Sequence, residues 1–284
     1  SLTDDLFNEF RNVATAYEKT QGNTYQWRVH FRGATSLTYM FENPNGPKTS
    51  SVQGTNTDYT WADVGSPKFM PWTIALPQHH WDVVTLQVWQ DDIKATLKTD
   101  TAAVNAIITA TRSRADNATT RFFIYAPWTV VKYDDLNSYR QAFLAPSPNQ
   151  PEQLGAATRD YFRHVTESVR QTNPDVALIP TGEVLLALDD KMRAGKFEHL
   201  TSVQQLHRDV IHLNSLGSNV TAWTAYAVIF KKSPVGLPND IHPGKDFPPF
   251  KNVTEVSPAD LKLLQETIWE LVSSPELKVY TKIP

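Results

Sequence analysis

The sequence predicts a three-layer α/β fold in which helices cover both faces of a doubly wound parallel sheet. Short apolar runs of strand length recur along the chain, and longer segments with helical periodicity separate them. Parallel strands need crossover connections, which helices of this length provide. No Pro/Gly/Ser-rich linker and no internal repeat divides the sequence, so we predict one domain over residues 1–284.

The expected strands are short and bounded by turn residues. Residues 81–87 (WDVVTLQ) are typical of a buried parallel strand, because both faces of such a strand are covered and the run is nearly all apolar. The full set of expected strands is 24–31, 81–87, 121–128 and 176–180. Residues 33–78 are rich in Gly, Pro, Asn and Thr, and we expect them to form a long loop.

The expected helices carry apolar side chains at helical spacing. In residues 2–19, for example, Leu6, Phe10 and Val13 fall on one stripe, and Gly22 follows the end of the pattern. The other expected helices are 99–113, 153–172, 183–194, 217–230 and 258–273.

Composition narrows the function classes. The formal net charge is −3 and no basic run occurs, which argues against a nucleic-acid partner. No apolar stretch approaches the ~20 residues that cross a bilayer. The chain has no cysteine, which excludes disulfides, thiolate nucleophiles and cysteine-ligated zinc. The missing cysteines do not decide the compartment, for which we favour the periplasm or secretion.

The segment RDVIHLNSLG (208–217) places Asp209 three residues before His212. In the simplest interpretation the aspartate caps the following helix and the histidine is an ordinary hydrogen-bonded side chain. A metal site needs three or four convergent ligands, and His79-His80 is the one other histidine cluster, so we expect no metal. In a catalytic interpretation, Asp209 accepts from one ring nitrogen of His212 while the other nitrogen takes a proton from a hydroxyl nucleophile.

The segment DVIHLNSLGSNVTAWTAYAVIFKKSPVGLP (209–238) resembles the last block of the SGNH hydrolases, also called GDSL-type esterases, whose signature is D-x-x-H. The runs WDVVTLQ, IYAPW and IPTGEVLLALDDKMRAG resemble the strand before that family's third block, a later core strand and the helix after it. The resemblance thus covers nearly the whole chain. It implies a flavodoxin-like SGNH hydrolase fold with strand order 2-1-3-4-5, and a serine esterase without a cofactor.

The resemblance implies a nucleophilic serine at the start of the first helix, and Ser1 and Ser36 compete for this role. Ser1 precedes the amphipathic pattern of 2–19, whose first amide groups would face the reacting oxygen. Ser36 is soon followed by ENPNGPKTSSVQG, which we expect to form no helix. We therefore predict Ser1, and we expect the first strand and a Gly-Asp or Gly-Asn pair upstream of residue 1. In a less favoured alternative, LKVYTKIP (277–284) fills the place of that strand.

The same resemblance points to the groups that would bind the oxyanion. Gly33 matches the glycine of the second block, and Gln87 stands near the usual asparagine of the third, with Gln90 as a less favoured substitute. A turn glycine and a structural glutamine are the alternatives. The tryptophans that could form a platform for a sugar ring or an acyl group, unless they simply pack, are Trp61, Trp72, Trp89 and Trp128.

These residues predict a serine esterase that hydrolyses carboxylic esters. Ser1 attacks the ester, His212 moves the proton and Asp209 orients His212. The expected partner is a small-molecule or carbohydrate ester, with acetylated carbohydrate as one candidate. Two alternatives stay open: a lipid or small acyl-ester hydrolase, and a non-catalytic carbohydrate-binding or scaffold protein that keeps the fold.

Overall fold

The structure is a computed structural model, and it describes residues 21–22, 26–31, 35–45, 50–55, 71–88, 95–147, 149–239, 253 and 255–282. The helix expected over 2–19 lies outside these residues.

A parallel sheet of three strands follows the order β3-β4-β5. In β3 and β4, Val84 lies opposite Phe122, and Leu86 lies opposite Ile124. Apart from Arg121, every residue of β4 is buried, as is every residue of β5, because both faces of these strands are covered. The α/β class and the parallel strands predicted from the sequence are therefore confirmed. The strands are β3 (Val83–Gln87), β4 (Arg121–Ala126) and β5 (Ala177–Pro180).

Five long helices alternate with or follow these strands, close to the predicted ranges. Three of them begin at side-chain caps: Thr96 forms a capping box at the start of α5, Asn214 caps α9, and Ser257 with Pro258 opens α10. The helix expected over 153–172 begins only at Arg159, because Pro151 and Gly155 interrupt the pattern before it. The helices are α5 (Leu97–Arg112), α7 (Arg159–Arg170), α8 (Thr181–Arg193), α9 (Ser215–Phe230) and α10 (Pro258–Val272).

The long loop expected over 33–78 is wrong in part. The Ser36 hydroxyl accepts from the Tyr39 amide at 3.1 Å and so caps a short helix that the sequence pattern did not indicate. A polar strand and a second short helix, which holds Pro77 near its end, follow. Helices of six or seven residues are too short to show a helical periodicity, and the polar strand lacks the alternation of a half-buried strand. They are α3 (Leu37–Glu42), β2 (Ser50–Thr55) and α4 (Trp72–Gln78).

The strand expected over 24–31 is confirmed as β1 (Gln26–Phe31), but it pairs antiparallel with β2 in a separate two-stranded sheet. Val29 lies opposite Val52 in this pair. A local pattern of alternation cannot identify the partner strand, because pairing is a long-range property.

The alternative in which residues 277–284 supply a strand is wrong. Residues 275–281 form α11 (Pro275–Thr281), which begins at a Ser274 cap whose hydroxyl accepts from the Leu277 amide at 3.3 Å. The sequence patterns also missed α6 (Ser138–Phe143) and the 3₁₀ turns η3 (Ala115–Asn117) and η4 (Val203–Leu206).

The chain divides into two compact units. One contains α6, α8, α9, α10 and α11, and the other contains β1, β2, α3, α4, β3, α5, β4 and α7. The boundary passes through β5, between Leu178 and Ile179. Segments of the two units interleave along the sequence, and the single domain predicted for residues 1–284 stays a prediction.

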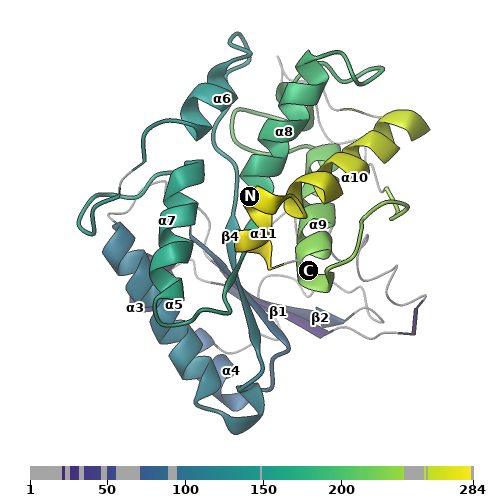
Figure 1. Cartoon of the computed structure of the whole chain (residues 1–284). Helices are drawn as coiled ribbons and strands as arrows, with labels where there is room; N and C mark the ends of the chain where they lie inside the picture. Colours follow the sequence, from purple (N-terminus) through teal and green to yellow (C-terminus); the bar gives the residue numbers. More distant parts are fainter. Residues whose placement is uncertain are drawn as a thin grey trace. The chain divides into compact units, whose positions relative to one another are not determined.

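Within the first unit, α9 is the central helix. Its residues are buried from Leu216 to Ile229, and it packs against α8 and α10, which Figure 1 shows grouped with it. A helix that is buried on all sides belongs to the core, so α9 is the centre of its unit. Among the described residues, no helix combines the length and the apolar character that a bilayer crossing demands.

Candidate functional site

The site is built around a direct hydrogen bond between Asp209 and His212 in the first unit. The His212 ring donates through Nδ1 to the Asp209 Oδ2 at 2.7 Å. A carboxylate can only accept, so this bond assigns the ring proton to Nδ1 and leaves Nε2 as the basic nitrogen. The side chain of Asp209 is 29% exposed and that of His212 is 33% exposed, so the pair is accessible at the surface of its unit. No hydrogen bond to Nε2 occurs among the described residues.

Asp209 also organises the backbone of the turn that separates it from His212. Its other oxygen, Oδ1, accepts from the amides of Ile211 at 2.9 Å and His212 at 2.7 Å. An aspartate that accepts from the backbone two and three residues ahead forms an Asx turn. The carboxylate therefore orients both the histidine ring and its main chain. The interpretation of Asp209 as a simple helix cap is wrong, because Asn214 caps α9 and accepts from the Gly217 amide at 3.0 Å.

The ends of this turn are tied to the start of α9. His207 and Leu213 form an antiparallel bridge, and the Arg208 amide donates to the His212 carbonyl at 2.9 Å. Gly217 lies against this bridge: a Cβ there would overlap the Leu206 carbonyl oxygen and lie 2.9 Å from the Leu213 Cβ. The glycine of the segment HLNSLG thus allows the helix to pack closely on the Asp–His turn.

The hydrogen bonds explain the acidity of Asp209. Partial burial by itself would raise the pKa of this carboxyl group, since it penalises the charged form. The amides of His212 and Ile211 and the His212 ring outweigh that effect and hold the pKa of Asp209 below its ordinary value. Asp209 is therefore ionised at neutral pH and can stabilise a positive charge on the ring of His212.

A second histidine, His207, lies in the core next to this turn. It is fully buried, its Nδ1 donates to the Val203 carbonyl at 3.0 Å, and its ring lies 6.4 Å from that of Tyr139. Burial lowers the pKa of His207 to about 4, so the ring is neutral at pH 7. Among the described residues its Nε2 has no hydrogen-bond partner. Sequence reasoning missed this residue because nothing in the local pattern marks it as buried.

Only some of the predicted site residues lie within the part of the chain that the structure describes. Asp209 and His212 come together as expected. Ser1 and Gly33, the predicted nucleophile and oxyanion glycine, lie outside the described residues, as do Gln90, Trp61 and Trp89. Their roles stay predictions.

Gln87, the predicted side-chain donor to the oxyanion, ends β3 in the second unit. Its Oε1 is buried without a hydrogen-bond partner among the described residues. The oxyanion role and the alternative, a structural side chain that bonds to a neighbouring loop, both stay predictions.

The competing serine, Ser36, is buried in the second unit and is 1% exposed. Its hydroxyl oxygen is already an acceptor for the Tyr39 amide. The argument against Ser36 from a missing helix is wrong, because α3 begins directly after it. Its burial and its role as a cap now make a different case against it as a nucleophile.

The described tryptophans and the histidine pair have structural contacts. Trp128 is buried and its indole N–H donates to the Ile211 carbonyl at 2.6 Å. Trp72 stacks on Phe41 with ring centroids 5.3 Å apart. His80 pairs with Asp82 at 3.5 Å on an exposed surface. Among the described residues no three histidine, aspartate or glutamate side chains group closely enough to hold a metal ion.

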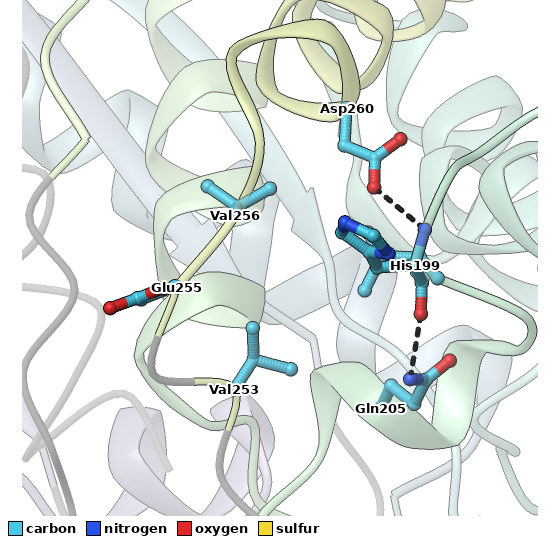
Figure 2. A pocket seen from close by; sticks show the side chains of 7 residues that line it. His199, Gln205, Val253, Glu255, Val256 and Asp260 are labelled. Carbon is cyan, nitrogen blue, oxygen red and sulfur yellow. Dashed lines mark hydrogen bonds between the residues drawn. The ribbon is translucent and has the colours of Figure 1, made fainter.

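A pocket of about 240 Å³ in the first unit offers a different place for a ligand. Figure 2 shows Asp260 bonded to the His199 amide and Gln205 bonded to the His199 carbonyl. Asp260 accepts in addition from the Glu198 amide, and the Gln205 oxygen accepts from the Thr201 amide. The polar groups of Asp260 and Gln205 are thus engaged in holding the local backbone, so they are poorly suited to bind a ligand.

Comparisons with known proteins bear on the fold. No family model matches the chain, and no curated protein matches it. The crystal structure of a DUF4886 family protein from Bacteroides uniformis is similar, with a TM-score of 0.60 and 13% sequence identity over 98% of this chain and 96% of that chain. At this identity the likeness shows a shared fold. The resemblance to the SGNH hydrolases stays a prediction.

Proposed function

We propose that the protein is a serine esterase that hydrolyses carboxylic esters, with Asp209 and His212 as its acid–base pair. The observation that carries the proposal is the 2.7 Å bond from the His212 ring to an ionised Asp209, with the basic Nε2 directed away from that bond on a partly exposed ring. A histidine held in this tautomer is a general base for a hydroxyl nucleophile. The motif D-x-x-H in the segment 209–238, which resembles the SGNH hydrolases, supports the same function.

In the proposed reaction, His212 Nε2 takes the proton of the Ser1 hydroxyl while the serine oxygen attacks the ester carbonyl carbon. Asp209 stabilises the imidazolium ion that forms. The imidazolium then protonates the departing alcohol, which leaves an acyl-serine. Water, deprotonated by His212, then attacks the acyl group, and His212 returns this proton to the serine oxygen as the acyl–oxygen bond breaks, which releases the acid and restores the free serine. The roles of Gly33 and Gln87 as donors to the oxyanion stay predictions from the sequence resemblance.

The test is hydrolysis of p-nitrophenyl acetate by the full chain. We expect His212→Ala to lower kcat/KM by at least ~10³-fold and Asp209→Asn to lower it by roughly 10²- to 10⁴-fold, as for other serine triads. His80→Gln is the matched control, because it removes the exposed His80–Asp82 pair. Full activity in His212→Ala would eliminate the acid–base assignment. A folded wild-type chain that hydrolyses no ester would favour the non-catalytic binding alternative.

The nucleophile is tested separately by a fluorophosphonate, which forms a covalent bond with an activated serine. Peptide mapping by mass spectrometry should place the adduct on Ser1, and Ser1→Ala should remove it. His212→Ala should also reduce labelling, because the histidine activates the hydroxyl. An adduct on Ser36 would show that the nucleophile is misassigned.

A second candidate, a hydrolase of lipid or small acyl esters, is favoured by one observation. Val210, inside the Asp–His turn, is 53% exposed. Its carbonyl accepts from the Val131 amide, and the neighbouring Val130 is 47% exposed. Exposed apolar side chains next to a site suit an apolar part of a substrate. If they bind it, Val210→Thr raises KM for p-nitrophenyl hexanoate more than for the acetate. The control is Val279→Thr on α11, where the valine is 61% exposed. Equal effects on both esters would leave the acetylated substrate as the better candidate.

A further inference from the structure

Three peptide groups join Asp209 to His212, and the last two of them are each held at both ends. In the peptide that joins Val210 to Ile211, the carbonyl accepts from the Val131 amide at 2.8 Å and the N–H donates to Asp209. In the peptide that joins Ile211 to His212, the carbonyl accepts from the Trp128 indole at 2.6 Å and the N–H donates to the same carboxylate at 2.7 Å. The segment that holds Trp128 and Val131 thus fixes the turn from outside.

Peptide geometry makes this arrangement directional. The carbonyl and the N–H of one trans peptide lie in a plane and point in opposite directions. A donor that fixes the carbonyl of Ile211 therefore aims the N–H of His212 at the Asp209 oxygen Oδ1. With Oδ1 held there, the other oxygen, Oδ2, lies within 2.7 Å of the ring nitrogen of His212. A hydrogen bond to the carbonyl also polarises the peptide and strengthens the bond that its N–H makes.

We propose that Trp128 is a positioning residue for the Asp209–His212 pair and that its indole N–H acts through the peptide of His212. Its catalytic consequence rests on the esterase function proposed above, whereas the positioning itself does not. The Val131 amide has the same role for the preceding peptide, but Trp128 acts through a side chain, so substitution can remove its donor. Trp128 is 9% exposed, which protects its hydrogen bond from water.

The test compares Trp128→Phe with Trp223→Phe in the full chain. Trp223 is also buried in the first unit and donates through its indole to a backbone carbonyl, that of Pro238, at 3.2 Å. It lies in α9, and among the described residues no hydrogen bond joins its side chain to the Asp–His turn, so it controls for the loss of a buried indole donor. If Trp128→Phe fails to fold, benzothienylalanine at position 128 removes the donor and keeps the ring shape.

Two NMR signals report the position of the pair without reference to activity. The first is the downfield proton on His212 Nδ1, and the second is the carboxyl carbon of Asp209 during an acid titration. In Trp128→Phe we expect the proton to move upfield or broaden, and the pKa of Asp209 to rise toward its ordinary value as its amide donors loosen. Trp223→Phe should leave both signals as in the wild type.

Kinetics then separate this inference from the proposed function. We expect Trp128→Phe to lower kcat for p-nitrophenyl acetate by roughly 10- to 100-fold while KM stays within about twofold, because misorientation affects the reaction more than binding. A folded Trp128→Phe protein with both NMR signals unchanged overturns the positioning role, whatever its activity. If the signals move but the wild type hydrolyses no ester, the positioning role stands and the esterase proposal fails.

Discussion

At the scale of single residues, the turn from Asp209 to His212 concentrates the polar interactions of the proposed site. One carboxylate accepts three hydrogen bonds, two from the backbone and one from the ring. Such a group is better stabilised as an anion in the folded chain than in water, which is why its pKa lies below the ordinary value. By linkage, this carboxylate stabilises the fold above its ordinary pKa, and that contribution is lost as the pH falls through the lower folded pKa.

His207 makes the first residue-scale prediction, which concerns acid stability. The unfolded chain binds a proton at the ordinary histidine pKa of about 6.5, whereas the folded chain binds it only near pH 4. Between these values the unfolded state carries more protons, so the free energy of unfolding falls as the pH is lowered. We expect a loss of about 2 kcal/mol between pH 7 and pH 5 from this residue.

Urea unfolding of the wild type and of His207→Phe at both pH values measures this loss. Phenylalanine keeps a ring beside Tyr139 and cannot take up a proton, so its stability should depend less on pH over this range. The substitution also lowers stability at pH 7, because the bond to the Val203 carbonyl is lost. A variant that loses as much stability as the wild type between pH 7 and pH 5 would contradict the role assigned to His207.

At the scale of elements, short helices depend on their caps and the long α9 depends on close packing. Ser36 caps α3, a helix of six residues that could not form alone in water. Gly217 lets the first turn of α9 lie directly on the Leu206 carbonyl. We therefore expect α3 to lose stability when its capping hydroxyl is removed, and α9 to lose stability when a methyl group is added at Gly217.

We predict that Ser36→Ala lowers the free energy of unfolding by about 1 kcal/mol, the usual effect of a lost cap. Ester hydrolysis and fluorophosphonate labelling should be unchanged, because this hydroxyl is engaged with the Tyr39 amide. Thermal unfolding together with the p-nitrophenyl acetate assay gives both quantities. Loss of activity at full stability would return Ser36 to the list of nucleophiles.

We predict that Gly217→Ala lowers the free energy of unfolding by roughly 2 kcal/mol, because its methyl group meets backbone that cannot move easily. The helix propensity of alanine works in the opposite direction and is smaller, at about 1 kcal/mol. Ser218→Ala, the neighbouring buried position in α9, is the control. Circular dichroism during urea unfolding measures both variants, and a Gly217→Ala chain as stable as the control would show that the turn accommodates a methyl group.

At the scale of the whole molecule, burial is uneven among the helices of the first unit. Helix α9 is buried from Leu216 to Ile229, whereas α11 has two buried residues, Leu277 and Thr281. Slow amide exchange requires opening of the structure that covers an amide. We predict that peptides from α9 exchange most slowly in hydrogen–deuterium mass spectrometry and that those from α11 exchange much faster. Equal rates in the two helices would contradict this description of the core.

The order of the three parallel strands and the five long helices after residue 81, and the pairing of Asp209 with His212, were predictable from the sequence, whereas the short helices α6 and α11 were not. Helical periodicity, buried-strand runs and a D-x-x-H spacing are local, so a linear pattern contains them. The partner of β1, the helix after Ser36, the burial of His207 and the hydrogen bond from Trp128 to Ile211 were decided only in three dimensions. Three of these features depend on contacts between residues far apart in the chain, and the helix after Ser36 is too short. A long-range contact and a short helix both lack the repeating pattern of apolar residues by which a sequence reveals structure.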